Sequence, residues 1–355
     1  MIDMELTDAQ QNVREMLHWF AANEMRPIAL EADRTGKIPL AFFKKTMEMG
    51  LAGGAGGDMD AAGEKEEGKK GESQSNRIGC IGAEELSWGD PALILTFPGP
   101  GLGGPPVKFT GTKDQQERAF RVFREDKENP HWGAYALTEP GAGSDVAGIS
   151  TTCRKDGNHY VLNGRKCFIT NGARADWNVV FATTDKSQGR AFLVFKDTPG
   201  FSVGKIEDKL GLRASETAEL VLEDCRVHQD DLLGGEERYT SASKEGFRTA
   251  MKTFDNTRPL VAAMAVGIAR AAFEIARDWV KENYDLKRPI PRYHVIADKL
   301  ADMEREINAA RLLCWKASWM GDLDIPNSRE ASVSKSYSAE VGQRVTAQAI
   351  EIMGP

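Results

Sequence analysis

The chain has 355 residues, of which 41% are hydrophobic and 28% charged, and its formal net charge at pH 7 is −7. This length can bury two or three cores, the composition is that of a globular protein, and the negative charge argues against a nucleic-acid surface. The five cysteines are scattered without metal-binding spacing, so no metal site is expected, and their pattern indicates reduced thiols in a cytosol-like compartment.

The N-terminal part of the chain is predicted to be helical. Thr7 followed by Gln10 is the pattern of a capping box, so a helix is expected to begin there. Further helices are predicted over Pro39–Leu51 and Gly82–Leu95. The first residues carry acids and no apolar core, so a signal peptide is not expected. The apolar run Pro259–Phe273, cut by Arg270, is too short for a membrane span.

Two glycine-rich stretches interrupt these helices. Residues 53–76 combine glycine with charge and contain almost no large apolar side chain. Such a segment cannot bury enough surface to order itself, so a long exposed loop is predicted. The stretch “FPGPGLGGPP”, residues 97–106, is expected to break the helical pattern again.

From about residue 131 the sequence changes to short apolar runs separated by turn residues. This spacing predicts a compact antiparallel β-domain that ends near Gly234. Within it, Asn163-Gly164 separates two strand-like runs and predicts a hairpin turn.

The last part of the chain is predicted to form long helices. One has an apolar stripe that runs from Val261 to Trp279, another a stripe from Ile296 to Ala317, and a third covers Arg329–Met353. Three helices make an incomplete bundle, so we expect a partner to supply a helix or further residues to follow. The predicted fold is therefore α+β and multidomain: a helical domain (1–130), a central antiparallel β-barrel-like domain (131–236) and a C-terminal helical bundle (237–355).

The stretch “YALTEPGAGSDV”, Tyr135 to Val146, places Gly141 and Gly143 where the backbone must turn or approach something closely. It is not a P-loop, because Ser144-Asp145 stands where Lys-Ser/Thr is required. It is not a dinucleotide fingerprint either, because Val146 replaces the third glycine. Backbone N–H groups of a tight turn can still form an anion site.

Four ordered blocks, “YALTEPGAGSDVAG”, “LNGRKCFITNGARADWNVV”, “GLRASETAELVLEDCRV” and “FDNTRPLVAAMAVGIA”, make the chain resemble the acyl-CoA dehydrogenase family. The likeness covers the chain apart from residues 53–76. It implies FAD-dependent α,β-dehydrogenation of an acyl-CoA thioester to a trans-2-enoyl-CoA, with electron-transferring flavoprotein as the acceptor.

The resemblance also implies which residues hold the cofactor. Tyr135, Leu137 and Thr138 would line the isoalloxazine, while Gly143 and Ser144 would approach the pyrophosphate and the thioester. In “CFIT”, Phe168 would shield one flavin face and Thr170 would hydrogen-bond near N5. The cofactor-binding set is therefore Tyr135, Leu137, Thr138, Gly143, Ser144, Phe168, Ile169 and Thr170.

In “FDNTRP”, Asn256 or Thr257 is expected to cap a helix whose first turn holds Pro259. Arg258 would then face the positive end of the helix dipole, and an anionic group should compensate it. By resemblance Asp255 and Arg258 contact the CoA moiety, so the substrate-binding set is Ser144, Asp255 and Arg258.

The sequence departs from the family pattern at three points. The catalytic glutamate lies in most members beyond the position of Pro355, and in others where this chain has Thr257, so no catalytic base is predicted here. Asn283 and Leu286 replace an arginine and a phenylalanine that reach a neighbouring subunit's FAD, and Glu351 replaces a glutamine with the same role.

These departures leave two interpretations open. The first is an active acyl-CoA dehydrogenase, a homotetramer in the cytoplasm or the mitochondrial matrix, with the cytoplasm preferred. The second is a non-catalytic or half-active subunit that a sister chain completes. Flavin oxidases or monooxygenases on the same fold remain a third possibility, since a fold does not determine its chemistry. The acyl group cannot be read from the sequence.

Overall fold

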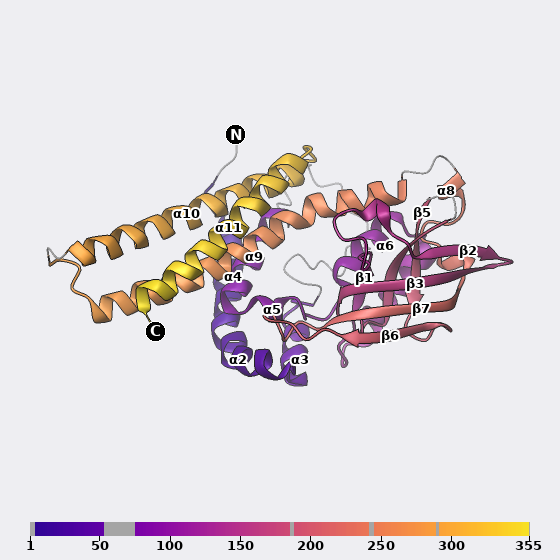
Figure 1. The fold of residues 1–355 in the computed structure, drawn as a ribbon, viewed down its shortest axis with the longest axis horizontal. Helices are drawn as coiled ribbons and strands as arrows, with labels where there is room; N and C mark the ends of the chain where they lie inside the picture. Colours follow the sequence, from indigo (N-terminus) through magenta and orange to yellow (C-terminus); the bar gives the residue numbers. More distant parts are fainter. Residues whose placement is uncertain (1–3, 53–74, 185–187, 241–244, 289–290, 355) are drawn as a thin grey trace. The chain divides into compact units, whose positions relative to one another are not determined.

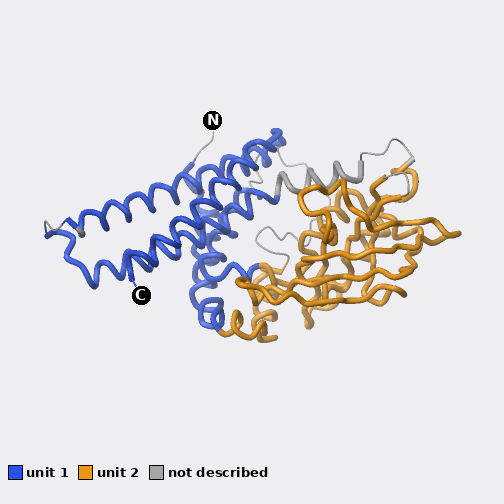
Figure 2. The backbone as a smooth tube through the Cα atoms, in the orientation of Figure 1, with its two compact units in different colours: residues 1–30, 65–94, 254–355 blue, residues 31–64, 95–253 orange. Residues whose placement is uncertain are grey.

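The computed structural model describes residues 4–52, 75–184, 188–240, 245–288 and 291–354. Contacts divide the chain into two compact units, shown in Figure 2: unit 1 comprises residues 1–30, 65–94 and 254–355, and unit 2 comprises residues 31–64 and 95–253. The loop predicted over residues 53–76 lies outside the described residues except for its last two, which begin a helix.

The described chain is helical, then β, then helical, as predicted (Figure 1). The helices before the sheet are α1 (Asp8–Phe20), the π-helical η1 (Ala21–Met25), α2 (Arg26–Thr35), α3 (Leu40–Glu48), α4 (Ser75–Gly89), α5 (Pro91–Ile94), the 3-10 turn η2 (Gly101–Gly103), α6 (Gly104–Thr110) and α7 (Lys113–Glu125). The predicted capping box is confirmed, because Gln10 N donates to Thr7 Oγ1 at 3.3 Å and Thr7 N donates to Gln10 Oε1 at 3.2 Å.

The stretch 97–106 breaks the helical pattern only in part. It contains η2 and the start of α6, whose first turn holds prolines. Proline is tolerated there because the N–H groups of a first turn have no intrahelical partner. The prediction of a simple break was therefore wrong for the end of this stretch.

The central part of the chain is a seven-stranded sheet in the order β1-β4-β2-β3-β7-β6, with β5 paired to β4. The strands are β1 (Gly133–Ala136), β2 (Thr152–Asp156), β3 (His159–Thr170), β4 (Trp177–Thr183), β5 (Gly189–Phe195), β6 (Phe201–Ile206) and β7 (Thr217–His228), with 3-10 turns η3 (Val146–Gly148) and η4 (Gln229–Asp231). Most pairs are antiparallel, as predicted, but β4 pairs in parallel with β1 and β2.

The hairpin predicted at Asn163-Gly164 is wrong. Strand β3 runs through both residues, and the register of β3 against β7 shifts between Leu162 and Gly164. Gly164 has φ +156°, and a Cβ there would lie 2.4 Å from Thr151 Oγ1. The glycine is therefore required by a bulge in a long strand rather than by a chain reversal. The reversal occurs at Gly157, between β2 and β3.

The C-terminal helices are α8 (Glu237–Thr240), α9 (Glu245–Asn283), α10 (Pro291–Asp322) and α11 (Ser328–Met353), the last close to its predicted bounds. The predicted start of a helix at Asn256 or Thr257 is wrong, because α9 begins at Glu245 and carries Pro259 in its interior. Arg258 therefore does not face a helix N-terminus. The helix continues through Pro259 although proline removes one main-chain hydrogen bond, and the propensities of the preceding residues do not explain this, because Thr, Asn and Asp are weak helix formers.

The predicted stripe of α10 is confirmed: Met303, Ala310 and Ala317 are fully buried. The stripe predicted for α9 is wrong, since Val261 and Ile275 are 44% and 49% exposed. The buried face of α9 is a neighbouring one, made of Ala262, Ala263, Val266, Ala269, Phe273, Ala276 and Val280. A helix that is apolar on nearly all sides does not reveal from its sequence which side packs inward.

Length and composition alone would let residues Thr257–Asn283 cross a membrane. The expectation that this run is too short for a membrane span is therefore wrong by length and composition, since Arg270 does not interrupt it. Arg270 pairs with the buried Glu84 and Glu85 of α4. The buried face of α9 is that of a core helix in unit 1, which satisfies the same test.

Candidate functional site

Strand β1 leads directly into the glycine-rich turn. Glu139 and Ala142 close this turn with two main-chain hydrogen bonds, of 3.0 Å and 3.1 Å. Neither Gly141 nor Gly143 adopts a left-handed backbone conformation, and a Cβ on either would meet no atom within 4 Å. Neither the backbone nor the packing of this chain requires glycine there. What the glycines preserve is open space beside the turn.

The end of strand β3 has an unusual backbone. Phe168 lies at φ +58°, in the left-handed region, and its side chain is 64% exposed. The β3–β7 register shifts between Lys166 and Ile169, so Phe168 lies in a bulge. A bulky residue in this conformation costs on the order of 1–3 kcal/mol, and such residues cluster at functional sites. Thr170 is exposed as well, whereas Ile169 is 2% exposed.

The turn and the end of β3 are joined by hydrogen bonds. Cys167 N donates to Thr138 O at 2.9 Å. Lys166 Nζ donates to Leu137 O at 3.1 Å and to Glu139 Oε1 at 2.7 Å. Both charged side chains are buried, with Lys166 fully enclosed. These contacts bring the two predicted cofactor segments side by side.

Glu139 is surrounded by donors. Its carboxylate accepts from Ser150 N at 2.6 Å, Ser150 Oγ at 2.7 Å and Thr151 N at 3.0 Å, besides Lys166. Burial opposes ionisation of Glu139, but the hydrogen bonds from Lys166, Thr151 and Ser150 outweigh it and lower its pKa to about 2. Glu139 is therefore an ionised anchor at neutral pH and cannot act as a base there.

A second clamp holds the residue after Thr170. Asn171 is also left-handed, at φ +58°; its N–H donates to Glu216 O at 3.0 Å and its side chain donates to Leu95 O at 3.0 Å. The Glu216 carboxylate accepts from Ala173 N at 2.9 Å and Arg174 Nε at 3.0 Å. Thr170 thus lies between two left-handed residues in a fixed segment.

Tyr135 lies on β1 with its ring 5.0 Å from that of Phe181, centre to centre. Burial raises the pKa of its phenol, so the side chain is neutral in the physiological range. Its hydroxyl can therefore serve as a neutral hydrogen-bonding group.

Eight of the predicted site residues belong to these two joined segments of unit 2: Tyr135, Leu137, Thr138, Gly143, Ser144, Phe168, Ile169 and Thr170. Phe168, Thr170, Gly143 and Ser144 are exposed, whereas Leu137 and Ile169 are buried and can offer only main-chain atoms. Asp255 and Arg258 belong to α9 in unit 1. The side chain of Asp255 lies outside the described residues, and that of Arg258 is half-buried.

Sequence analysis missed the residues that hold the segments together: Glu139, Lys166, Asn171 and Glu216. Their letters stand inside the quoted blocks, but a buried lysine on a strand looks like a surface residue in a single sequence. The sequence did contain one hint of this contact. Glu139 in “TEP” and Lys166 in “RKCFIT” carry opposite charges in two segments that were expected to be neighbours, so an ion pair between them could have been predicted.

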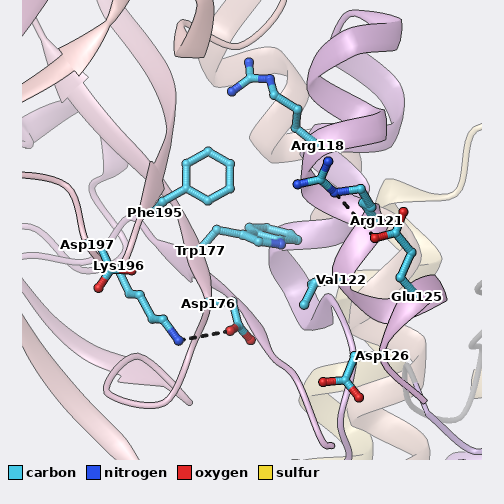
Figure 3. Close-up of a pocket in the computed structure, with 10 residues that line it drawn as sticks. All are labelled: Arg118, Arg121, Val122, Glu125, Asp126, Asp176, Trp177, Phe195, Lys196 and Asp197. Carbon is cyan, nitrogen blue, oxygen red and sulfur yellow. Dashed lines mark hydrogen bonds and ion pairs between the residues drawn. The ribbon is translucent and has the colours of Figure 1, made fainter. Parts of the chain in front are cut away.

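A separate cavity of about 350 Å³ lies in unit 2 beside α7, and none of the predicted site residues lines it (Figure 3). Trp177 and Phe195 provide apolar walls, and the ion pairs Lys196–Asp176 (3.4 Å) and Arg121–Glu125 (3.8 Å) stand around them. Among the described residues, no group of three or more His, Cys, Asp or Glu side chains could hold a metal ion.

The order of parts and the strand-and-turn site define a helical–β–helical enzyme fold, and three family models match it in the same order. They are the acyl-CoA dehydrogenase N-terminal domain (residues 7–123), middle domain (134–225) and C-terminal domain (244–355). The chain belongs to the acyl-CoA dehydrogenase family.

Individual relatives agree with this assignment. The short-chain specific acyl-CoA dehydrogenase of Clostridium acetobutylicum is 37% identical over 99% of this chain and 89% of its own length. The structure of butyryl-CoA dehydrogenase from Megasphaera elsdenii has a TM-score of 0.83 and 34% identity, covering 99% of this chain and 90% of its own. A glutaryl-CoA dehydrogenase from Mycobacterium smegmatis, solved in complex with FADH2, has a TM-score of 0.83 and 25% identity, covering 98% and 85%.

Proposed function

We propose that this protein is an FAD-dependent acyl-CoA dehydrogenase that converts an acyl-CoA thioester to a trans-2-enoyl-CoA, an oxidoreductase step of fatty acid β-oxidation. The observation that carries this proposal is Phe168: a strained, exposed aromatic residue beside Thr170, joined through Thr138 to a glycine turn with open space around it. Folding alone gives no reason to keep an exposed phenylalanine in a left-handed backbone.

The residues of the two joined segments fit a flavin. Tyr135, Leu137 and Thr138 would hold one side of the ring system, and Gly143 with Ser144 would offer main-chain N–H groups to the pyrophosphate. Phe168 would cover a face of the ring and exclude water, while Ile169 and Thr170 would supply hydrogen-bonding groups at its edge. FAD, when bound, supplies the hydride acceptor.

The substrate is proposed to be a short-chain acyl-CoA. Support comes from the names of the relatives, a short-chain specific and a butyryl-CoA dehydrogenase. Ser144 would contact the thioester, and Asp255 with Arg258 the CoA moiety. Arg258 is charged at any accessible pH, which suits the phosphates of CoA. The catalytic base is left unassigned.

We further propose a homotetramer, or a heteromer with a sister subunit, that passes electrons to electron-transferring flavoprotein in the cytoplasm or the mitochondrial matrix, preferably the cytoplasm. Exposed apolar side chains on the C-terminal helices support assembly through them: Val261 and Ile275 on α9, Leu312 on α10, Val333 and Ile350 on α11. The five cysteines are buried free thiols, which suits a reducing compartment. The three-domain division at residues 130 and 236 is kept as part of this proposal.

The test is a titration of the flavin-free protein with FAD, followed by anaerobic addition of butyryl-CoA. We expect saturable FAD binding and then loss of the oxidised-flavin absorbance as the substrate reduces it. Protein that ignores excess FAD would refute the proposal. Light scattering on the same sample tests assembly, and a stable monomer at micromolar concentration would refute that part.

The second candidate is the non-catalytic or half-active subunit. This candidate is favoured by Asn283, Leu286 and Glu351, which stand where the family pattern has residues that reach a neighbour's FAD. Asn283 donates to Trp279 O at 2.8 Å and Glu351 pairs with Lys299 at 2.6 Å, so both are engaged within their own chain. Firm FAD binding without reduction by butyryl-CoA or other acyl-CoAs would select this candidate.

A further inference from the structure

Two buried charges occupy the junction between the segments assigned to the flavin. Lys166 is 0% exposed and Glu139 3% exposed, and their Nζ and Oε1 atoms lie 2.7 Å apart. Lysine and glutamate are almost never fully buried unless they are paired, because desolvating each ion costs several kcal/mol. An apolar pair of similar size would often hold a fold at least as well. The pair therefore calls for a role other than stability.

The contacts of the pair indicate that role. Lys166 stands two residues before Phe168 and reaches across to Leu137 O, which stands one residue before Thr138. Glu139 stands one residue after Thr138, at the start of the glycine turn, and its carboxylate accepts hydrogen bonds from Ser150 N and Thr151 N. One ammonium group and one carboxylate thus fix the two segments against each other and fix the turn against both.

We propose that Glu139 and Lys166 are a positioning pair for the flavin: they hold Thr138, the glycine turn and Phe168 in register, and flavin binding depends on them more than the fold does. This inference rests on the proposed function. Neither side chain needs to touch the flavin. Both act through Leu137 O and the main chain of the turn.

The decisive variant is the double substitution Glu139→Gln/Lys166→Met. Each single substitution leaves one buried charge without its counter-ion, so Glu139→Gln or Lys166→Met alone should lower the melting temperature strongly. The double variant removes both charges and should recover most of that loss, to within about 3 °C of the flavin-free native protein. It does not recover the bond to Leu137 O. We therefore expect its FAD dissociation constant to be at least about tenfold higher than native, and the absorption band of its bound flavin to be shifted.

Gln115→Met is the matched control. Gln115 is a buried polar residue of unit 2 that donates to Asp230 O at 2.7 Å and Leu232 O at 2.8 Å. Its other hydrogen bonds are to Thr112 and Gly234, which lie outside the flavin segments. It should lower the melting temperature and leave FAD affinity and spectrum as in the native protein.

Two results would overturn the inference: a double variant that binds FAD with native affinity and spectrum, or a control that loses as much FAD affinity as the double variant for the same loss of melting temperature. Failure of the native protein itself to bind FAD would instead refute the proposed function, so the two failures are distinguishable.

Discussion

Both units bury charged side chains, but the two groups are built differently. In unit 1, Glu84 and Glu85 of α4 face Arg270 of α9, and Arg311 of α10 also reaches Glu84, at 2.8 Å. In unit 2, one lysine meets one carboxylate, and main-chain and hydroxyl donors supply the other contacts. The first group joins α4 to two helices, α9 and α10, that lie far from it in the sequence. The second joins two short segments that carry the candidate site.

The buried charges of unit 1 stabilise the packing of helices, whereas the Glu139–Lys166 pair of unit 2 connects the segments of the candidate site. Arg270 forms hydrogen bonds to both glutamates, and these outweigh its burial, so its pKa is raised further above an already high value. Burial opposes ionisation of Glu85, yet hydrogen bonds from Arg270 and His18 lower its pKa. Glu84, Glu85 and Arg270 each have more than one counter-charge, which offsets the cost of their burial, and Arg270 is the residue that both glutamates share.

The largest effect is therefore expected for Arg270→Met. Without Arg270, Glu84 keeps Arg311 as its counter-charge, whereas among the described residues Glu85 keeps only partners whose side chains are more than 40% exposed. Removing one partner of a buried ionic group costs about 3–5 kcal/mol. The free energy of unfolding, from denaturant titration, measures it. Arg277→Met on the same helix is the control: its partner Asp278 is 54% exposed, and a change within about 0.5 kcal/mol is expected. A loss below 1 kcal/mol for Arg270→Met would show that the cluster contributes little to the fold.

The next effect is the pH dependence of the Glu139 contribution. Its folded-state pKa, about 2, is below the unfolded value of about 4.3. A depressed carboxyl pKa stabilises the fold above the unfolded pKa, and this contribution is lost as the pH falls toward the folded pKa. The free energy of unfolding of the native protein should exceed that of Glu139→Gln by about 2–3 kcal/mol near pH 6. This difference should shrink between pH 4.5 and 2.

Paired urea titrations of native protein and Glu139→Gln across that pH range measure the gap. At pH 2 the native carboxyl, with its pKa of about 2, is about half protonated in the folded state and almost fully protonated in the unfolded state, so only a small part of the gap should remain. A gap that does not change with pH would mean that the carboxylate charge contributes nothing and that only the shape of the side chain matters.

A third effect tests how closely the helices of unit 1 pack. A Cβ on Gly267 of α9 would lie 2.2 Å from Glu84 O, so Gly267→Ala must push α9 away from α4. Overpacking of this kind costs about 1–3 kcal/mol. Gly342→Ala on α11 is the control, since its Cβ would meet nothing closer than 3.5 Å. There the helix propensity of alanine should add up to about 1 kcal/mol. Equal changes of melting temperature would contradict the packing argument.

The sequence predicted the order of helical and β parts because periodicity and turn residues report local structure. The four blocks of letters also predicted which segments would bind the cofactor, and the structure joins two of those segments by hydrogen bonds. That these residues bind FAD stays a prediction. Sequence reasoning failed at Asn163-Gly164, where β3 pairs with β7 through a bulge and does not turn, and at Pro259, which lies inside α9 and not at its start. The contact between Lys166 and Glu139 depends on tertiary packing, which neither propensity nor spacing contains.

The smallest expected effect concerns Phe168, where site and fold compete directly. Its left-handed backbone costs roughly 1–2 kcal/mol in a residue with a Cβ, while glycine adopts that conformation freely and loses about 0.5–1 kcal/mol of chain entropy. Because the side chain is 64% exposed, its removal sacrifices little burial. The flavin-free Phe168→Gly protein should therefore be as stable as native or more stable by about 0.5–1 kcal/mol. Its FAD affinity should fall by about two- to tenfold, the value of one aromatic contact.

Leu212→Gly is the control, because Leu212 is a left-handed residue of the same unit, at φ +51° and 42% exposed. It should show the same stability change with native FAD affinity. If Phe168→Gly lowers the stability and leaves the FAD affinity native, the phenylalanine ring contributes to the stability of the fold. The strain at Phe168 would then no longer support a flavin site.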